Sequence, residues 1–175
     1  MSDDSGSLGK TIDLGFAPLI TSSSSVLILG TLPSVKSLQE NQYYGHPRNA
    51  FWWIMSELCG FEFNASYSNR CHSLLEHKIA VWDVISSCYR PGSLDSKIDQ
   101  STLVPNDFTT LLGQSSKVKL VAFNGQAACK LFTKFIHLDN VSHCEFITLP
   151  STSPANAVMT KEAKCERWRK IMRYL

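Results

Sequence analysis

The stretch YYGHPRNAFWW at residues 43–53 is the part of the sequence with the most evident chemistry. It places two tyrosines and three further large aromatic residues on either side of a Gly-His-Pro-Arg-Asn turn. Aromatic rings bury large areas in protein cores, and their faces also stack on flat ligands. The stretch therefore has two interpretations, ordinary core packing and a pocket that grips a flat molecule.

Other segments with small, polar, Pro or Gly residues follow short apolar runs. The runs predict buried strands at about residues 26–30, 80–85, 119–124 and 144–150, and the segments after them are GTLPS, ISS, NG and PSTSPAN. Between the runs, the apolar residues of AFWWIMSELCG recur at helical spacing and end at Gly60. GQAACKLFTKF and the basic C-terminal segment also have helical patterns.

Apolar strands that alternate with helices predict an α/β fold with three layers, αβα, around a central four-stranded parallel sheet. Ligands in such folds bind at the carboxyl ends of the strands. We therefore expect the polar segments to form the rim of one pocket. Residues 1–10 are expected to be a flexible tail, and residues 11–175 a single domain.

The overall composition is that of a globular protein with a sizeable core. Apolar residues make up 43% of the chain, and the net charge is +2. The six cysteines have no C-x-x-C spacing, which argues against a zinc ribbon or an iron–sulfur cluster and favours free thiols in a reducing compartment. The polar, acidic N-terminus does not look like a signal peptide, and no apolar stretch approaches the length of a membrane span.

Five segments taken in order resemble one branch of a known enzyme superfamily. GTLPS, YYGHPRNAFW, AVWDVISSCYRPGSLDS, FNG and LPSTSPANA are similar to the hypoxanthine-DNA glycosylase branch of the uracil-DNA glycosylase superfamily. YYGHPRNAFW also resembles the matching run of mismatch-specific uracil-DNA glycosylases. The resemblance covers about residues 14–175 and implies a uracil-DNA glycosylase-like fold.

By this resemblance, a target base swings out of the DNA stack and enters the pocket. Tyr44 would stack on the base. Asn124 would pair with the carbonyl acceptor and ring N–H donor that hypoxanthine and uracil both present. Backbone N–H groups of Thr31 and Leu32 would meet the base as well. Asn124 also has a simpler interpretation as a turn or cap residue before the helix that follows.

The sequence lacks the residues that usually position the catalytic water in this superfamily. Many superfamily members have Asp or Asn where this chain has Leu32, and many have His where it has Ser151. The resemblance to the hypoxanthine branch points to Asn49, whose amide can orient a water toward the sugar. The alternative is that Asn49 only caps the helix that begins after it.

Several residues around the predicted pocket are expected to contact DNA. They are Ser34, Arg48, Arg90, Ser151, Ser153 and Asn156. A bulky wedge enters the duplex from the loop after the fourth strand in related enzymes, but here that position is Ala155, so Asn156 or another loop would have to serve. No lysine nucleophile is evident in the pocket loops, which predicts a monofunctional enzyme without lyase activity.

The resemblance thus implies a base-excision repair glycosylase that hydrolyses the N-glycosidic bond of hypoxanthine in DNA. Alternatives are a glycosylase for uracil or several deaminated bases, and an α/β module that binds DNA or a nucleotide without catalysis. A serine hydrolase is disfavoured because no G-x-S-x-G motif is present. We expect no metal, no cofactor and no membrane partner, a monomer, and an intracellular location with DNA.

Overall fold

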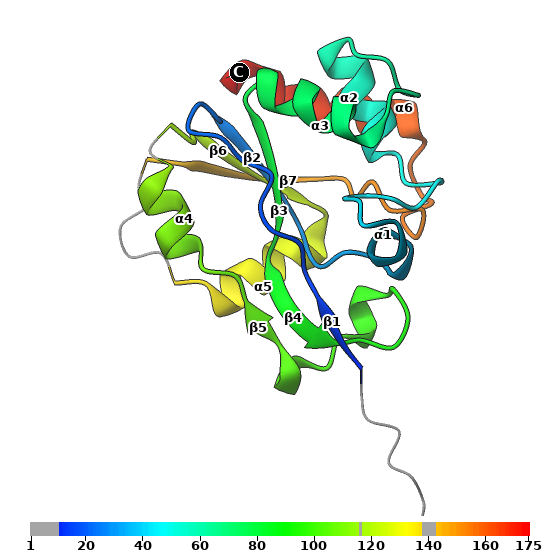
Figure 1. Cartoon of the computed structure of the whole chain (residues 1–175), viewed down its shortest axis with the longest axis vertical. Helices are drawn as coiled ribbons and strands as arrows, with labels where there is room; N and C mark the ends of the chain where they lie inside the picture. The colour runs from blue at the N-terminus through cyan, green and yellow to red at the C-terminus, as the bar shows by residue number, and fades with distance from the viewer. Residues whose placement is uncertain (1–10, 116, 138–142) are drawn as a thin grey trace, which may run out of the picture.

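A four-stranded parallel sheet forms the centre of the protein. The computed structural model describes residues 11–115, 117–137 and 143–175, so the expected tail at residues 1–10 lies outside the described residues. The sheet has the order β3-β2-β6-β7 (Figure 1). Its strands are β2 (Val26–Gly30), β3 (Ile79–Asp83), β6 (Leu120–Asn124) and β7 (Glu145–Leu149). All four strands of the predicted sheet are present.

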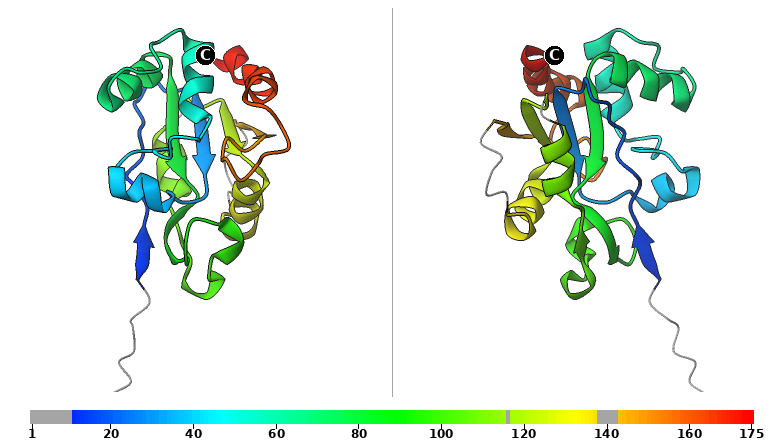
Figure 2. Two further views of the ribbon diagram at one scale, coloured as in Figure 1. Left: turned by 90° about the vertical axis from the view of Figure 1, so that its right-hand side faces the viewer. Right: turned by 60° about the vertical axis from the view of Figure 1, so that its left-hand side comes forward.

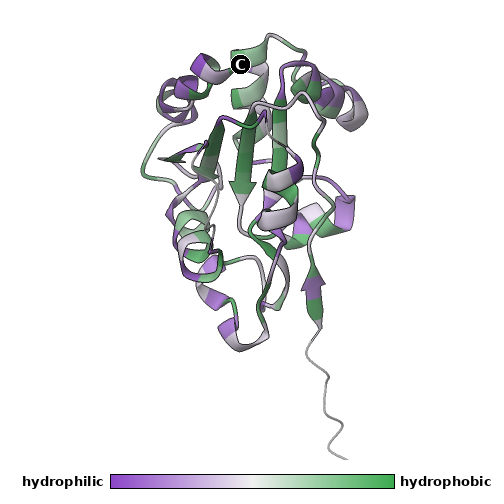
Figure 3. Cartoon of the chain, turned by 90° about the vertical axis from the view of Figure 1, so that its left-hand side faces the viewer, coloured by the Kyte–Doolittle hydropathy of each residue, from purple (hydrophilic) through white to green (hydrophobic). Residues whose placement is uncertain are grey.

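Helices cover both faces of this sheet, which confirms the predicted three-layer architecture. Alternate residues of β2 point to opposite faces: Val26 and Ile28 belong to one core cluster, and Leu27 and Leu29 to another. Figure 3 shows the central strands as continuously hydrophobic. The first cluster includes residues of α2 (Phe51–Cys59), α3 (Tyr67–Glu76), α6 (Lys161–Trp168) and the 3-10 helix η3 (Arg169–Tyr174), and the second includes residues of α4 (Phe108–Gln114) and α5 (Gln126–Phe135).

The apolar face predicted for the first long helix is buried as expected. Phe51, Ile54 and Met55 of α2 are fully buried, and Leu58 nearly so. All six cysteines are free thiols, of which Cys88 and Cys165 are buried. Within the described ranges, no helix is long and apolar enough to cross a membrane.

The strand predicted at about residues 80–85 runs past the end of β3 to the first residue of a second strand, which belongs to a different sheet. β3 ends at Asp83, and β4 (Ile85–Tyr89) joins an antiparallel sheet of order β1-β4-β5 with β1 (Ile12–Leu14) and β5 (Val104–Pro105). This small sheet lies beyond the carboxyl ends of the central strands (Figure 2). In β4, Ile85 and Cys88 are buried and the two serines between them are half-buried, so this strand lacks the continuous apolar run by which the central strands were predicted.

Three helices were not expected from the sequence. α1 (Val35–Glu40) has only six residues, and α3 fully buries only Leu74, so neither has a strong apolar stripe. Each of α1, α3 and α4 begins at a side-chain cap, because Ser34, Ser66 and Asp107 accept a hydrogen bond from the backbone N–H three residues later. In the sequence, these three helices were therefore indicated by the capping residues at their starts and not by a helical spacing of apolar residues.

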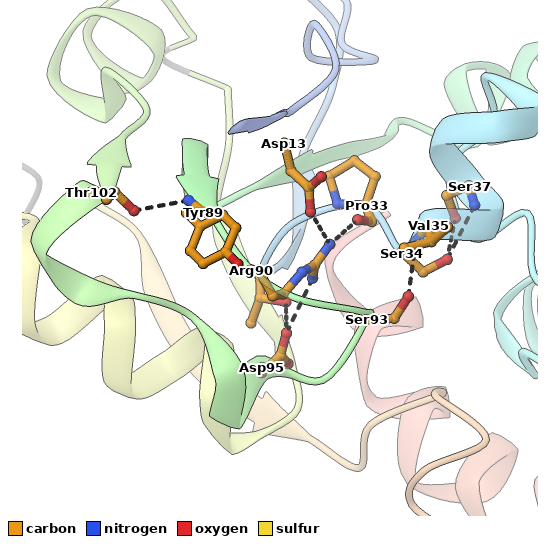
Figure 4. A network of polar contacts seen from close by, with 11 residues as sticks. Asp13, Pro33, Ser34, Val35, Ser37, Tyr89, Arg90, Ser93, Asp95 and Thr102 are labelled. Atoms are coloured by element: carbon orange, nitrogen blue, oxygen red, sulfur yellow. Dashed lines mark hydrogen bonds and ion pairs between the residues drawn. The ribbon is translucent and has the colours of Figure 1, made fainter. Parts of the chain in front are cut away.

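Arg90 fastens the small sheet to the loop after β2. Its side chain is only 1% exposed and lies 3.3 Å from the Asp13 carboxylate and 3.7 Å from that of Asp95 (Figure 4). It also donates a hydrogen bond to the carbonyl of Pro33. The prediction that Arg90 contacts DNA phosphates is therefore wrong, because its charge is buried and already paired with two carboxylates.

We expect Arg90→Met to lower the free energy of unfolding by about 3 kcal/mol. This is the low end of the range for removing one partner of a buried ion pair, because Asp95 is partly exposed. The measurement is urea denaturation at pH 7. The control is Arg169→Met, which removes an exposed pair with Glu166 and should change the value by no more than about 0.5 kcal/mol. Equal effects of the two substitutions would contradict the structural role of Arg90.

Candidate functional site

A cavity of about 100 Å³ lies at the carboxyl-terminal edge of the central sheet. The parallel register places Gly30 beside Asp83 and Asn124 beside Leu149, so the polar ends of the strands meet there. Eight of the eleven residues predicted for the site line this cavity: Thr31, Leu32, Ser34, Tyr44, Asn49, Asn124, Ser151 and Ser153. The other three predicted residues, Arg48, Arg90 and Asn156, do not line it.

Tyr44 provides an aromatic wall. Its ring stacks on Phe51 with the ring centres 3.9 Å apart and the planes at 22°. Phe51 thus covers one face, and a flat ligand would have to stack on the other. Tyr44 also has a φ of +53°, in the left-handed region that non-glycine residues seldom adopt. Such strain is most often found at functional sites, where the surrounding structure holds it in place.

The aromatic neighbours of Tyr44 belong to the core. The Tyr43 hydroxyl donates to the carbonyl of Ala17 at 2.8 Å, and the indole N–H of Trp52 donates to the carbonyl of Tyr43 at 2.8 Å. Phe51 and Trp52 are buried, and Trp53 is partly buried against the same core cluster. The aromatic stretch therefore serves both interpretations: Tyr44 lines the cavity, and most of the other rings hold its loop in position.

The amide of Asn124 is held in one orientation by Thr152. Its Oδ1 accepts from the Thr152 N–H at 2.8 Å, and its Nδ2 donates to the Thr152 hydroxyl at 2.9 Å. An amide has two acceptor lone pairs and two N–H donors, so one of each remains for a ligand. Asn124 lines the cavity, and its side chain also lies close enough to the Tyr44 hydroxyl to lower the pKa of that hydroxyl.

Thr152 is a buried residue that the sequence analysis did not single out. Besides its two bonds with Asn124, its carbonyl accepts from the N–H of Ala50 at 3.0 Å. It therefore joins the loop after β7 to the end of β6 and to the start of α2. The only sequence signal was its place between Ser151 and Ser153.

Asn49 lies at the cavity and also bonds to the backbone at the start of α2. Its Oδ1 accepts a hydrogen bond from the Phe51 N–H at 3.0 Å, so Asn49 caps the first N–H group of α2 from the residue before the N-cap position, Ala50. The neighbouring His46 accepts a bond from the Arg48 N–H through Nδ1, so His46 shapes the turn, and Arg48 is exposed beside it.

The loop after β7 is held by its own side chains and by a buried lysine. The Ser151 hydroxyl accepts from the Ser153 N–H at 3.2 Å, and Nδ2 of Asn156 donates to the Ser151 carbonyl at 3.1 Å. Lys164 of α6 donates to the Asn156 carbonyl at 2.8 Å. The side chain of Asn156 thus turns back onto its own loop, which is against its predicted use as a DNA contact or wedge. Val158, 98% exposed, is the large apolar side chain that this loop presents to solvent.

The loop after β2 is held in place by side-chain hydrogen bonds to Asp95 and to the first turn of α1. The Thr31 hydroxyl donates to Asp95 at 2.7 Å, and the Ser34 hydroxyl accepts from the Ser37 N–H at 3.1 Å as the cap of α1. Leu32 is buried against Ile85 and Cys88. Thr31 and Leu32 therefore offer the cavity their backbone more than their side chains.

Asp83 is the acidic residue that the sequence analysis missed. It ends β3, lines the cavity and is 4% exposed. Burial and the nearby Asp95 raise its pKa to about 7, although Arg90 acts in the opposite direction. Burial and Asp83 also raise the pKa of the Tyr44 hydroxyl, which stays protonated. The sequence signal was a lone Asp at the end of an apolar strand, where no charge would be expected.

A wider hollow adjoins the first cavity on the side of β7. It has a volume of about 540 Å³, shares Ser151 with the first cavity, and is lined in part by Arg167 and Lys170. Both cations are exposed and lie on the basic C-terminal segment noted in the sequence. Among the residues that the structure describes, no group of three His, Cys, Asp or Glu side chains could hold a metal ion.

Comparison with known proteins places this geometry in a family. The family model described as the uracil DNA glycosylase superfamily matches residues 17–175. A protein of Methanosarcina acetivorans named hypoxanthine DNA glycosylase is 34% identical over 93% of this chain and 99% of its own. A protein of the same name from Methanosarcina barkeri is 39% identical over 64% of this chain and 70% of its own.

A solved structure has the same fold. It is a solution NMR structure of a candidate uracil DNA glycosylase from Methanosarcina acetivorans, with a TM-score of 0.76 and 33% identity, and the match covers 93% of this chain and 98% of that one. The polar edge of the parallel sheet and the family match over nearly all of the described residues lead to one conclusion: this chain belongs to the uracil DNA glycosylase superfamily.

Proposed function

We propose that this protein excises hypoxanthine from DNA by hydrolysing the bond between the base and its sugar. The observation that carries the proposal is the convergence of Tyr44, Asn49 and Asn124 on one cavity in a chain that is 34–39% identical to proteins named hypoxanthine DNA glycosylase. A base in a duplex cannot reach such a cavity while stacked, so the nucleotide must rotate out of the helix first.

Recognition of the base rests on a flat wall and a fixed amide. Tyr44, backed by Phe51, offers a stacking face worth roughly 1–3 kcal/mol for a base. The remaining donor and acceptor of Asn124 match the carbonyl and ring N–H of a deaminated base. Adenine and cytosine present an amino group instead of the carbonyl and leave this pair unsatisfied. Uracil has the same edge as hypoxanthine, which makes uracil excision the second candidate activity.

Water attack on the sugar is assigned to Asn49. Its Oδ1 is a weak base, but the bond from the Phe51 N–H fixes its position at the cavity. Orientation of a water at an electrophilic sugar carbon needs position more than basicity. The cap and the catalytic role are therefore compatible, because the cap is what holds the amide still.

The DNA backbone is expected to cross the basic hollow. Arg167 and Lys170 line it, Arg48 is exposed beside Asn49, and Ser34, Ser151 and Ser153 lie at the cavity for phosphate or sugar contacts. Lys164 has its ammonium on backbone carbonyls, which suits a structural role and supports a monofunctional enzyme without lyase activity. The protein is proposed to act as a monomer.

The first test uses duplex oligonucleotides that carry one deoxyinosine or one deoxyuridine, followed by alkali. We expect strand breakage at deoxyinosine, and no breakage before the alkali step. Breakage only at deoxyuridine would move the assignment to uracil. Intact strands at both bases, with DNA still bound, would refute a glycosylase.

We expect Asn49→Ala to lower the single-turnover rate on deoxyinosine by about 10²-fold or more, because the water loses its positioning group. The substitution should cost only about 1 kcal/mol of stability, the usual cost of a lost cap. Asn49→Ser is the matched control, since serine restores the cap oxygen but is too short to replace the amide at the cavity. If Asn49→Ser recovers the wild-type rate, Asn49 acts only as a cap.

Asn124→Ala should lower both the rate and the preference for deoxyinosine over deoxyadenosine, because the fixed donor and acceptor are lost together. Thr152→Val is the companion variant. It keeps the Asn124 amide but removes the Thr152 hydroxyl that helps to orient it. We therefore expect smaller decreases than in Asn124→Ala, both in the single-turnover rate and in the preference for deoxyinosine over deoxyadenosine. Unchanged discrimination in Asn124→Ala would exclude this residue from base recognition.

A further inference from the structure

The floor of the cavity holds a carboxyl group that the function proposed so far does not use. Asp83 lies beside Gly30 in the parallel register of β2 and β3. A Cβ at position 30 would lie 2.5 Å from Oδ1 of Asp83 and 3.2 Å from the Tyr44 hydroxyl. Only glycine at position 30 leaves room for this arrangement. The Asp83 carboxyl and the Tyr44 hydroxyl therefore both lie next to Gly30.

Both groups have a polar atom that lacks an ordinary hydrogen bond. Oδ2 of Asp83 and the hydroxyl of Tyr44 are buried and make no hydrogen bond of ordinary geometry among the described residues, although the Asn124 side chain lies close enough to the Tyr44 hydroxyl to lower its pKa. A buried polar atom left unpaired costs stability, so such atoms in native proteins are usually satisfied by a water, an ion or a ligand. The two oxygens are therefore available to a water or to a ligand that enters the cavity.

The charges around Asp83 favour its neutral form. Asp95 raises the pKa of Asp83, and Arg90, which acts in the opposite direction, is shared with Asp13 and Asp95. The hydroxyls of Tyr43 and Tyr44 are neutral neighbours, because burial and Asp83 raise their pKa values. Burial is the largest cause of the raised pKa of Asp83, about 7. At neutral pH a substantial fraction of Asp83 is therefore a carboxylic acid, which can donate a hydrogen bond or a proton.

Depth in the cavity decides which part of a nucleotide Asp83 would meet. A rotated base enters first, while its sugar stays attached to the strand at the mouth. Asp83 is 4% exposed, whereas Asn49 is half-buried and neighbours the exposed Arg48. The floor group thus meets the base, and Asn49 meets the sugar carbon and its water.

We propose that Asp83, in its neutral form, is the general acid that protonates the leaving hypoxanthine. The proposal rests on the excision of hypoxanthine proposed above. When the C1′–N9 bond breaks, its electron pair passes to the base, and the Asp83 proton moves to an acceptor atom of that base. The water oxygen bonds to C1′ and gives its proton to solvent. The Asp83 carboxylate then takes a proton from solvent.

The chemistry of purines suits an acid at this place. A purine has ring-nitrogen acceptors besides the glycosidic nitrogen, such as N7, and these can take up a proton as negative charge develops. General-acid catalysis contributes about 10²–10⁴-fold when the acid has a pKa near the working pH. The site has no Asp in the loop after β2, and it has Ser151 after β7. Asp95 also lines the cavity, but its Oδ1 accepts from Thr31 and lies 3.7 Å from Arg90, whereas Oδ2 of Asp83 is unpaired. Asp83 is therefore the carboxyl group that is free to act on the base.

The test is the pH dependence of single-turnover excision of deoxyinosine from pH 5 to 9, for the wild type and for Asp83→Asn. The wild-type rate should fall about tenfold per pH unit above the Asp83 pKa. Asp83→Asn should be about 10²–10⁴-fold slower at pH 6 and independent of pH. Its affinity for a duplex with a hydrolysis-resistant 2′-fluoro deoxyinosine should stay within about twofold, because an amide is similar in shape and still donates.

Asp95→Asn is the matched control. Asp95 also lines the cavity and raises the pKa of Asp83, so its removal should move the pH limb to lower pH without abolishing it. A limb that disappears in Asp95→Asn and persists in Asp83→Asn would overturn the proposal. A wild-type rate that rises with pH would also overturn it, because Asp83 would then act as a base. An unchanged rate in Asp83→Asn would overturn it as well.

A measurement of stability provides a readout that is independent of activity. The pKa of Asp83 is higher in the folded protein than in the unfolded chain, so the folded state binds its proton more tightly. The free energy of unfolding should therefore decrease as the pH rises from about 4 to 7, and Asp83→Asn should remove this part of the decrease. An identical pH dependence in both proteins would contradict the neutral, buried acid.

Failure of this proposal can be told from failure of the proposed function. If the wild type cleaves deoxyinosine but Asp83→Asn does so equally well, only the role of Asp83 is wrong. If the wild type leaves deoxyinosine intact at every pH, the proposed function itself is wrong.

Discussion

The parallel register of β3-β2-β6-β7 is the constraint on which the rest of the structure depends. Strands buried on both faces must be apolar along their length, so polar groups can appear only where the strands end. Because the strands run in the same direction, those ends meet at one edge. Gly30, Asp83 and Asn124, far apart in the sequence, therefore line one cavity.

The loops at this edge are held together by few contacts. Thr152 binds both ends of the Asn124 amide and also the N–H of Ala50, and so couples three segments. Arg90 also couples segments: it pairs with Asp13 of the small sheet and donates a hydrogen bond to the carbonyl of Pro33 in the loop after β2. The site thus combines well-anchored supports with two buried oxygens, Oδ2 of Asp83 and the Tyr44 hydroxyl, that lack ordinary hydrogen bonds. Fixed supports around unsatisfied groups are what a binding site requires, because a ligand then meets donors and acceptors that need no rearrangement.

Much of this arrangement could be predicted from the sequence, and the failures have physical causes. Apolar runs locate all four central strands, and the polar segments after them locate six of the cavity residues. The other two predicted cavity residues, Tyr44 and Asn49, come from the aromatic stretch at residues 43–53. Arg90 was misplaced because a sequence does not show that Asp13 and Asp95 bury its charge. Asp83 and Thr152 were missed because their importance comes from neighbours across the sheet, Gly30 and Asn124, and not from their own segments. The helices α1 and α3 were missed because caps define them more than apolar periodicity does.

The central claim is that the edge cavity receives a base rotated out of DNA. The most direct measurement is a crystal structure of the protein with a duplex that carries a 2′-fluoro deoxyinosine resistant to hydrolysis. The account predicts that the hypoxanthine lies in the cavity, stacked on the face of Tyr44 opposite Phe51, with the Asn124 amide about 3 Å from its carbonyl and ring N–H. A hypoxanthine that stays stacked in the duplex, or DNA bound to another face with the cavity open, would contradict it.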